Sequence, residues 1–230
     1  MTDLILGIDD AGRGPVIGPM ILAGCLIEKS KARELSKLGV KDSKQLTQKR
    51  REFLEGEIKE SAEDIEVSVC SPKEIDSWND KGLKLNELEA EHCAKIIDKL
   101  NSRLLEKNKT KKKVKVILDC PSVSLVKWRD FLMTKIKELS NLDISCEHKA
   151  DVNHPAVAAA SVLAKCQRER EMGKLRKKYG DKIGSGYTSD TLSVEFLKKN
   201  HHKFKDDGIF RKSWETWKRI AGQEGQRKLV

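Results

Sequence analysis

The sequence predicts an α/β fold built around a mixed β-sheet. Short apolar, β-prone runs separated by turn residues lie within residues 4–70, which is typical of antiparallel strands. A strand–helix–strand pattern over residues 114–147 predicts a parallel pair, because a crossover of that kind joins parallel strands. From about residue 155 the pattern is helical. The 230 residues can bury a substantial core and suit one domain, or one domain with an appended lobe.

The first elements follow from local signals. Strands are predicted at 4–9 and 19–27, with a Gly/Pro-rich loop between them, and a third at 65–70. These three are expected to form an antiparallel meander. Helices are predicted at 31–38 and 47–62, the second capped by Thr47, and Pro72 opens another short helix.

The later elements show a clearer periodicity. Residues 85–106 carry an apolar stripe wide enough to lie on a sheet, which predicts a long helix. A strand at 114–118 ends in Asp119, a helix is predicted at 123–139, and a strand at 142–147 leads to Asp151. The helical segments after residue 155 are broken at 180–188 and near 206–208.

Composition narrows the class of protein. Lys+Arg number 46 against 36 Asp+Glu, and the net charge of +10 favours a polyanionic partner without identifying it. The six cysteines have no C-x-x-C spacing, which argues against a zinc site, and several lie in apolar strand patterns, where a reduced thiol is a small hydrophobe. Without a signal peptide at its start, the chain is expected in the cytoplasm. No apolar stretch approaches the roughly 20 residues that span a bilayer, so no membrane association is expected.

Four aspartates each follow an apolar run at or near the carboxyl end of a predicted strand: Asp9, Asp10, Asp119 and Asp151. In a mixed sheet these ends can lie close together, and carboxylates without histidine or thiolate partners suit Mg²⁺ or Mn²⁺. Two such ions about 4 Å apart can activate a water in phosphodiester hydrolysis. Two structural alternatives stay open: an acidic turn after the first strand, and helix capping by the later acids. Adjacent strand residues face opposite ways, so both early acids serve one cluster only if the strand bends or ends there.

Five segments carry a resemblance to a known family. They are Gly-Ile-Asp-Asp-Ala-Gly-Arg-Gly-Pro-Val-Ile-Gly-Pro at 7–19, Val-Lys-Asp-Ser-Lys at 40–44, Glu-His-Lys-Ala-Asp at 147–151, Ala-Ala-Ala-Ser-Val-Leu-Ala-Lys at 158–165 and Gly-Ser-Gly-Tyr-Thr-Ser-Asp at 184–190. In this order they resemble the type 2 ribonucleases H, most of all the archaeal branch, over residues 4 to about 217. The resemblance implies an α/β ribonuclease H-like fold, with a five-stranded mixed sheet flanked by helices and a C-terminal helical lobe. We divide the chain into a catalytic core at 1–165 and a helical substrate-binding lobe at 166–230.

The resemblance also implies an activity and a metal site. The family cleaves the RNA strand of RNA/DNA hybrids and incises at ribonucleotides embedded in duplex DNA. Its metal-binding acids correspond to Asp9, Asp10, Asp119 and Asp151, with Mg²⁺ or Mn²⁺ as cofactor. Similar chains have glutamate where Asp10 stands, so this carboxylate reaches roughly 1.5 Å less far. An alternative reading is therefore a catalytically weakened nucleic-acid-binding protein on the same fold. A phosphate-binding metabolic enzyme is not favoured, because no P-loop or Gly-x-Gly-x-x-Gly motif occurs.

Substrate contacts are implied at several further positions. Selectivity for RNA requires detection of the 2′-hydroxyl, and the resemblance assigns the contacts with this group and its phosphate to Gly12, Arg13 and Gly14. Tyr187, in a glycine-rich loop, would pack on the sugar at an RNA–DNA junction; a core tyrosine is the structural alternative. The remaining phosphate-contact candidates are Ser43, Lys44, Lys165 and Arg211. A monomer is expected. A sliding-clamp partner is conceivable but unsupported, since residues 223–230 have little of the required apolar cluster.

Overall fold

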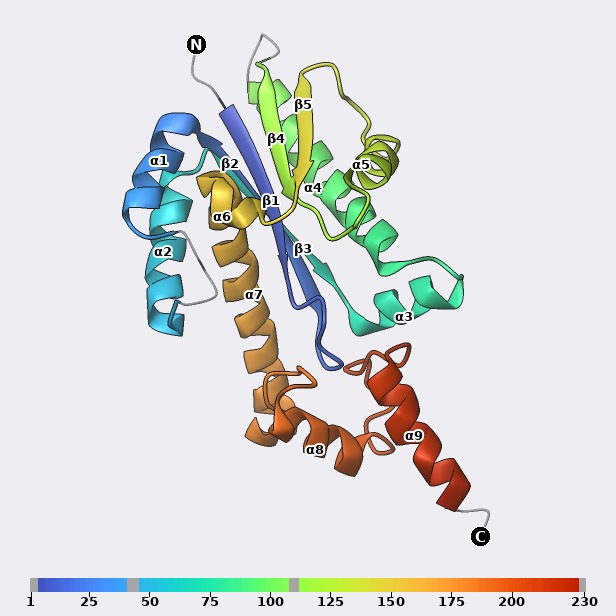
Figure 1. Ribbon diagram of the computed structural model, residues 1–230. Coiled ribbons are helices and arrows are strands. Elements are labelled where there is room, and N and C mark those ends of the chain that lie inside the picture. Colours follow the sequence, from blue (N-terminus) through green and yellow to red (C-terminus); the bar gives the residue numbers. More distant parts are fainter. Residues whose placement is uncertain (1–3, 41–45, 108–111, 228–230) are drawn as a thin grey trace. The chain divides into compact units, whose positions relative to one another are not determined.

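The computed structural model describes residues 4–40, 46–107 and 112–227, with side chains up to residue 222. Five strands form one sheet in the order β3-β2-β1-β4-β5 (Figure 1). Their bounds are β1 Leu4–Ala11, β2 Met20–Glu28, β3 Asp64–Cys70, β4 Val114–Asp119 and β5 Leu142–Glu147. β1 pairs with β2 in antiparallel and with β4 in parallel orientation, and β4 and β5 are also parallel. The predicted five-stranded mixed sheet is confirmed.

Within unit 1, residues 1–11, 21–68 and 86–166, helices lie on both faces of this sheet (Figure 1). The helices of the described residues are α1 Lys29–Lys37, α2 Gln48–Ser61, α3 Pro72–Asp80, α4 Leu85–Lys107, α5 Leu125–Met133, α6 Ala150–Asn153, α7 Pro155–Tyr179, α8 Thr191–Asn200 and α9 Glu215–Arg227. Side chains of α1, α2 and α7 pack against one face, through alternate β2 residues such as Ala23 and Cys25. On the other face, α4 places Ile96 and Leu100 over Gly24. None of the described helices is long and apolar enough to cross a membrane.

The helix starts follow the sequence signals. The Thr47 hydroxyl accepts the backbone N–H of Arg50 at 3.3 Å and begins α2, as predicted. Pro72 stands in the first turn of α3, where its missing N–H costs nothing, and the Ser71 hydroxyl accepts the N–H of Glu74 at 3.1 Å.

A glycine sets the distance between β1 and α7. A Cβ atom added to Gly7 would lie 2.2 Å from the carbonyl carbon of Ala156, so no larger residue fits there. The first turns of α7 are lined with small buried residues, Ala156 to Ala160, which allow this close approach. The contact brings buried Ser161 of α7 toward the carboxyl half of β1, the part of the strand that holds the acids.

Two predicted boundaries were wrong. β1 does not end at Asp9 but runs to Ala11, because β2 continues to pair with it at Asp10↔Leu22 and Ala11↔Ile21. α5 ends at Met133 instead of 139. The Thr134 hydroxyl donates to the Phe131 carbonyl at 2.7 Å, and the next backbone N–H groups bond to carbonyls three residues back, which converts the predicted last turns into tight turns.

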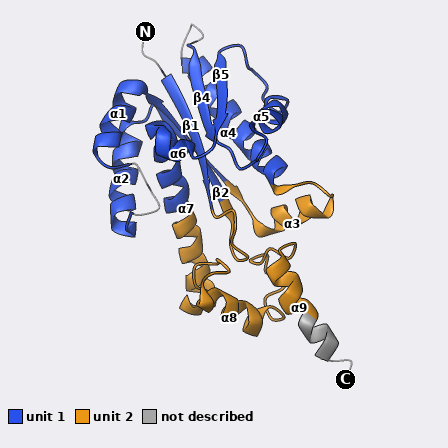
Figure 2. Cartoon of the chain, in the orientation of Figure 1, with its two compact units in different colours: residues 1–11, 21–68, 86–166 blue, residues 12–20, 69–85, 167–230 orange. Residues whose placement is uncertain are grey.

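The chain separates into two compact units (Figure 2). Unit 1 contains residues 1–11, 21–68 and 86–166, and unit 2 contains 12–20, 69–85 and 167–230. The division drawn from the sequence near residue 165 places the two short segments 12–20 and 69–85 with the core, whereas here they group with the carboxyl-terminal part. Unit 2 has its own apolar cluster, in which Val16 and Ile17 pack with Phe196 and Phe210.

Candidate active site

Asp9 and Asp119 lie on one face of the sheet in unit 1. The β1–β4 register pairs Ile8 with Leu118, so the next residue on each strand is an aspartate. Asp9 is only 7% exposed, and its Oδ1 accepts the backbone N–H of Asp10 at 2.8 Å. Because β1 continues past Asp10 as regular strand, strand alternation directs that side chain to the opposite face, where it is half-buried.

Asp119 also organises the start of α6, which carries Asp151. Its Oδ1 accepts the N–H of Ala150, the first residue of that helix, at 2.8 Å. Lys149, just before, has a left-handed backbone with φ 57°, the one non-glycine residue with positive φ in the described ranges. This turn joins β5 to α6 and keeps half-buried Asp151 one residue beyond the Asp119 contact. One Asp119 oxygen therefore satisfies a backbone N–H at the start of α6, and not of the helix that follows Asp119 in the sequence, while the carboxylate lies beside Asp9.

Burial and like charges act together on Asp9. Burial raises the pKa of Asp9 well above its usual value, and the negative charges of Asp10 and Asp119 raise this pKa further. A hydrogen bond from the Ser161 hydroxyl and the N–H of Asp10 oppose the shift. A buried carboxylate that is repelled by two others is costly in isolation, and a divalent cation bound by oxygen ligands would offset this repulsion. The donor set therefore fits Mg²⁺ or Mn²⁺.

Two neighbours of this group escaped the sequence analysis. Glu89 of α4 is only 2% exposed, and its charge, with those of Asp10 and Asp9, adds to the burial that raises the pKa of the Cys93 thiol. Glu89 therefore lies near the acids, but in the sequence it interrupts a helical stripe and follows no strand. Ser161 stands in the small-residue segment at 158–165, whose composition gives no reason to select its hydroxyl.

Among the described residues, no three of the predicted metal-binding acids have oxygen atoms as close together as the ligands of a single ion, so they form a loose group.

In unit 2 the loop at 12–19 and the loop at 184–190 are joined. The N–H groups of Val16 and Ile17 donate to the Gly186 carbonyl at 2.9 and 3.2 Å. Arg168 donates to the Ser185 carbonyl at 2.9 Å, and its guanidinium carbon lies 4.9 Å from the centroid of the Tyr187 ring. The two loops that the sequence assigned to ribose and sugar contacts are thus brought together.

Tyr187 is a surface residue. It is 38% exposed, which does not support the alternative of a core tyrosine. The loop that carries it is fixed by Asp190, whose Oδ2 accepts the Ser185 N–H at 2.7 Å and the Ser185 hydroxyl at 2.8 Å. These hydrogen bonds lower the pKa of Asp190, so the carboxylate is ionised and the loop is tied at neutral pH.

The two glycines that flank Arg13 differ in whether packing explains the absence of a side chain. Gly12 has φ +81°, and a Cβ there would lie 2.2 Å from Arg168 Nε, so its identity is explained by packing. Gly14 is exposed, and a Cβ there would meet nothing within 4 Å. Open space above a residue without a side chain lets a ligand approach the backbone, and this makes Gly14 the better candidate for a direct contact.

Arg211 is fully buried and hydrogen-bonds to the backbone of the 12–19 loop from the protein interior. Its guanidinium donates to the carbonyls of Gly12, Arg13 and Gly18 at 2.6, 2.7 and 3.1 Å. Burial, followed by the positive charge of Arg168, lowers the pKa of Arg211 to about 10, so it stays charged at neutral pH. All these donors point into the protein, which favours a positioning role over the phosphate contact proposed from the sequence.

The other candidates are less informative. Lys165 is half-buried on α7 in unit 1, and Arg13 is half-buried in unit 2. Ser43 and Lys44 lie outside the described residues. Trp214 and Trp217 both border the apolar cluster of unit 2.

Comparisons with known proteins show which family the chain resembles over its whole length. The sequence profile described as ribonuclease HII matches residues 6–217. The ribonuclease HII of Methanocaldococcus jannaschii is 38% identical over 239 residues, covering 99% of each chain. The solved ribonuclease H2 from Pyrococcus horikoshii OT3 superposes with a TM-score of 0.80 at 37% identity, covering 98% of this chain and 99% of that one. The ribonuclease HII in a solved PCNA complex from Archaeoglobus fulgidus gives 0.76 at 38% identity, covering 92% and 95%.

Profile, sequence identity and fold extend over almost the whole chain and agree with one another. The chain therefore belongs to the ribonuclease HII family and is a metal-dependent endonuclease that cleaves RNA in RNA/DNA hybrids.

Proposed function

We propose that the enzyme incises at single ribonucleotides embedded in duplex DNA as well as in longer hybrids, and that Asp9, Asp10, Asp119 and Asp151 hold two Mg²⁺ or Mn²⁺ ions. The observation that carries the metal assignment is the buried Asp9 beside Asp119, on one sheet face, with its pKa raised by burial and by its acidic neighbours. When bound, such ions activate the attacking water and stabilise the leaving oxygen.

The protein's own residues would act by holding the acids in place. Ser161 and the N–H of Asp10 favour the ionised form of Asp9, which is the form that binds a cation. The Ala150 N–H fixes one oxygen of Asp119 and so orients the other. Strand alternation turns Asp10 away from Asp9, and its side chain is shorter than the family's glutamate, so we propose Asp10 as the weakest of the four ligands.

Recognition of the ribonucleotide is assigned to unit 2. Gly14 offers an exposed backbone for the 2′-hydroxyl, and Arg13 beside it has a guanidinium suited to a phosphate. Tyr187 presents a half-exposed ring that its stacking with Arg168 keeps in one orientation. A ring held in this way can pack on one sugar and exclude a wrongly placed one.

The test is cleavage of a DNA duplex with one ribonucleotide, with and without Mg²⁺ or Mn²⁺. Asp119→Asn should abolish turnover while leaving duplex binding intact, because the amide keeps the shape but loses the charge that ligates a metal. Asp130→Asn, which changes an exposed aspartate of α5, is the matched control and should cleave normally. Binding without cleavage by the unaltered enzyme would favour the alternative of a weakened binding protein. Normal cleavage by Asp119→Asn would remove this residue from the site.

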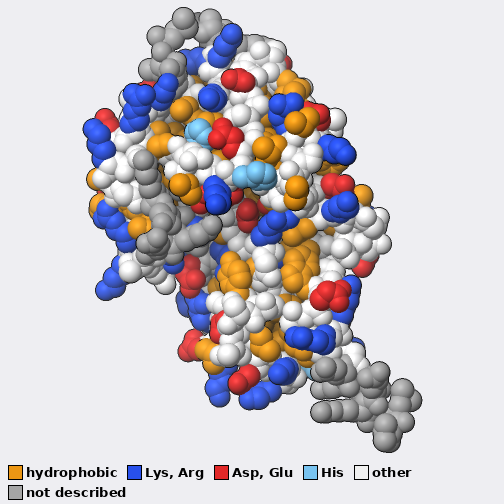
Figure 3. Space-filling model, in the orientation of Figure 1, with side chains coloured by type: hydrophobic (Ala, Val, Ile, Leu, Met, Phe, Trp, Pro, Cys, Tyr) orange, Lys and Arg blue, Asp and Glu red, His pale blue; other side chains and the backbone are white. Residues whose placement is uncertain are grey.

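Partners and location are proposed more broadly. The net charge of +10 supports binding along a nucleic-acid backbone, and Figure 3 shows lysine and arginine side chains spread over the visible face among scattered acids. We also propose a cytoplasmic, monomeric enzyme; the cytoplasmic location is supported by the six cysteines, all of them among the described residues, none of which forms a disulfide. The Archaeoglobus relative was solved with PCNA. A clamp complex of this chain is a proposal that rests on that relative, and co-elution with an archaeal clamp in gel filtration would test it.

A further inference from the structure

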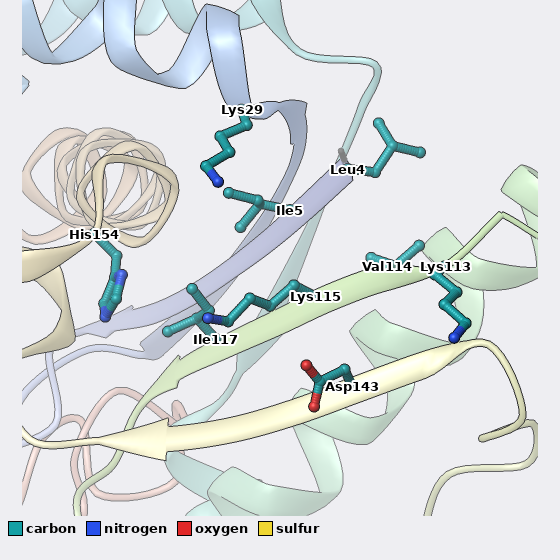
Figure 4. A pocket seen from close by; sticks show the side chains of 9 residues that line it. All are labelled: Leu4, Ile5, Lys29, Lys113, Val114, Lys115, Ile117, Asp143 and His154. Atoms are coloured by element: carbon teal, nitrogen blue, oxygen red, sulfur yellow. The ribbon is translucent and has the colours of Figure 1, made fainter. Parts of the chain in front are cut away.

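One face of the sheet in unit 1 has a hollow near the start of β1 and β4. The register places Ile5, Lys115 and Asp143 in a row across β1, β4 and β5. Further along the same face Ile117 packs with Ala150 and Val157, where α6 and α7 cover the strands. Before that contact a hollow of about 390 Å³ remains (Figure 4). Parallel strands are normally buried on both faces, so a lysine exposed at this place on a central strand is unusual.

The hollow combines an apolar floor with a basic rim. Ile5 and Ile117 form the floor, and Lys29, Lys113, Lys115, Asp143 and His154 surround it. Leu4 and Val114 border the hollow, but strand alternation directs their side chains to the other face of the sheet. Figure 4 shows the Lys29 side chain extending from α1 toward Ile5, while the Lys115 side chain runs along β4 toward the side that His154 occupies. The side chains of Lys29, Lys115 and His154 therefore come from separate elements and lie around the same space.

The charges around the hollow are not balanced. Two lysines without an ion-pair partner among the described residues, Lys113 and Lys115, face one carboxylate, Asp143. Lys113, Lys115 and Asp143 are exposed, and none of them forms an ion pair with another described residue. His154 is held at the edge by its Nε2–H, which donates to Glu147 Oε2 at 2.8 Å. A preformed hollow with excess positive charge is complementary to an anion.

We propose that this hollow is a nucleotide-binding site separate from the metal-binding acids. The lysines would bind the phosphate, the apolar floor would carry the base, and Asp143 would accept a hydrogen bond from a ribose hydroxyl or an exocyclic amine. An inorganic phosphate would leave the floor uncovered, and an apolar ligand would leave the lysines unmatched. The volume lies at the lower end of the roughly 300–1,000 Å³ of small-molecule sites, which suits one nucleotide. Lys115 precedes Asp119 by four residues of β4, a separation of about 13 Å at ~3.3 Å per residue.

The nucleotide can come from two sources, a free mononucleotide or the terminal nucleotide of a nucleic-acid strand. Amide NMR of the full-length protein in EDTA, which keeps metal-bound phosphate out of the acids, would follow titration with adenosine 5′-monophosphate, adenosine, inorganic phosphate and a short 5′-phosphorylated single-stranded DNA. The monophosphate should shift the amides of Ile5, Lys115, Ile117, Asp143 and His154. Adenosine and phosphate alone should bind at least about fivefold more weakly, because each engages half of the site. Stronger shifts of these amides with the DNA would identify a strand end as the source.

Variants make the assignment specific. Lys115→Glu should weaken binding of the monophosphate by about tenfold or more, because it places a negative charge beside the phosphate. Lys95→Glu is the matched control, since Lys95 is exposed on α4, which packs on the other face, and should leave affinity within about twofold. Asp143→Asn removes the one negative charge of the rim at an exposed position and should tighten binding of the monophosphate. A misfolded variant would bind more weakly, so tighter binding cannot result from misfolding.

Three results would overturn the proposal. One is a set of shifts confined to the neighbours of Asp9 and Asp119, which would place the nucleotide at the active site. Another is unchanged affinity in both Lys115→Glu and Asp143→Asn. The third is equal affinity for phosphate and for the monophosphate, which would reduce the hollow to a nonspecific anion contact.

Discussion

Replacing Arg211 tests whether a buried arginine sets the geometry of the substrate loop. Arg211→Ala would remove three hydrogen bonds to the carbonyls of Gly12, Arg13 and Gly18. Hydrogen bonds from a charged donor contribute ~1.5–3 kcal/mol each, so the gross loss is about 4–9 kcal/mol. Because whole proteins are stable by only ~5–15 kcal/mol, this variant is expected to unfold too readily to be informative.

Arg211→Lys is the sharper change. The ammonium group keeps the charge, but it lacks the planar fork that reaches three carbonyls in different directions, so one or two of them lose their donor. We expect a cost of about 2–5 kcal/mol, or a melting temperature lower by roughly 4–20 °C at ~2–4 °C per kcal/mol. Cleavage at a single ribonucleotide should fall more than hybrid binding, because the displaced backbone is the part proposed to contact the ribose.

The assay combines thermal unfolding with hybrid binding over a range of salt concentrations. Lys212→Ala is the control, because Lys212 is exposed and its side chain makes a surface contact with Asp206 at 3.5 Å. An arginine that contacts phosphate would show the reverse pattern: a wild-type melting temperature in Arg211→Lys, and a smaller salt dependence in a variant without the charge. That result would refute the positioning role.

The remaining predictions concern the acids and two loops. Asp9→Asn should abolish activity yet raise the melting temperature in EDTA. Because folding raises the pKa of Asp9, the gain should be absent below the unfolded pKa, grow as the pH rises toward the folded pKa and stay constant above it; calorimetry from pH 4 to 8 showing no gain would contradict this. Asp10→Glu should increase turnover in Mg²⁺ and narrow its deficit relative to Mn²⁺, which tolerates looser geometry; a measured decrease would show that Asp10 is fully adapted. Tyr187→Ala should lose cleavage at a single ribonucleotide more than cleavage of an all-RNA strand, whereas equal losses would indicate a structural tyrosine. Lys149→Gly should keep the fold and Lys149→Val should cost about 1–2 kcal/mol in urea unfolding, because φ is 57° there; equal stability of the two would refute the strain.

The sequence predicts elements well where one period dominates. β5 has the predicted bounds, and α4 differs from its prediction by a single residue, because alternation and helical stripes are local properties. The end of β1 was missed because pairing with β2 at Asp10 depends on a partner strand. The grouping of segment 12–20 is not a local property either. The place of this segment in unit 2 depends on contacts such as the bridge between Ile17 and Phe210, which no local pattern contains.

The candidate site divides in the same way. Motif resemblance selects Asp9 and Asp119, and the structure brings them onto one face. Motif resemblance cannot select Ser161 or Arg168, because a serine in an alanine-rich helix and an arginine in a basic helix are ordinary residues in a linear sequence. Their roles arise only when α7 is placed against β1 and when the loops of unit 2 close around the guanidinium.

The activity of this enzyme should depend on Gly7, although Gly7 has no side chain that could take part in the reaction. A glycine-to-alanine change is a common choice in stabilising libraries, because it reduces the freedom of the unfolded chain. At this position the added methyl group would meet the backbone of Ala156 at 2.2 Å and force α7 outward, together with the Ser161 hydroxyl that supports Asp9. The variant would lose ion affinity while every acid remained in the sequence. Protein engineers who seek a more heat-resistant form should therefore keep Gly7 fixed and direct such changes to Gly56 or Gly173, helical glycines with no atom within 3.4 Å of an added Cβ.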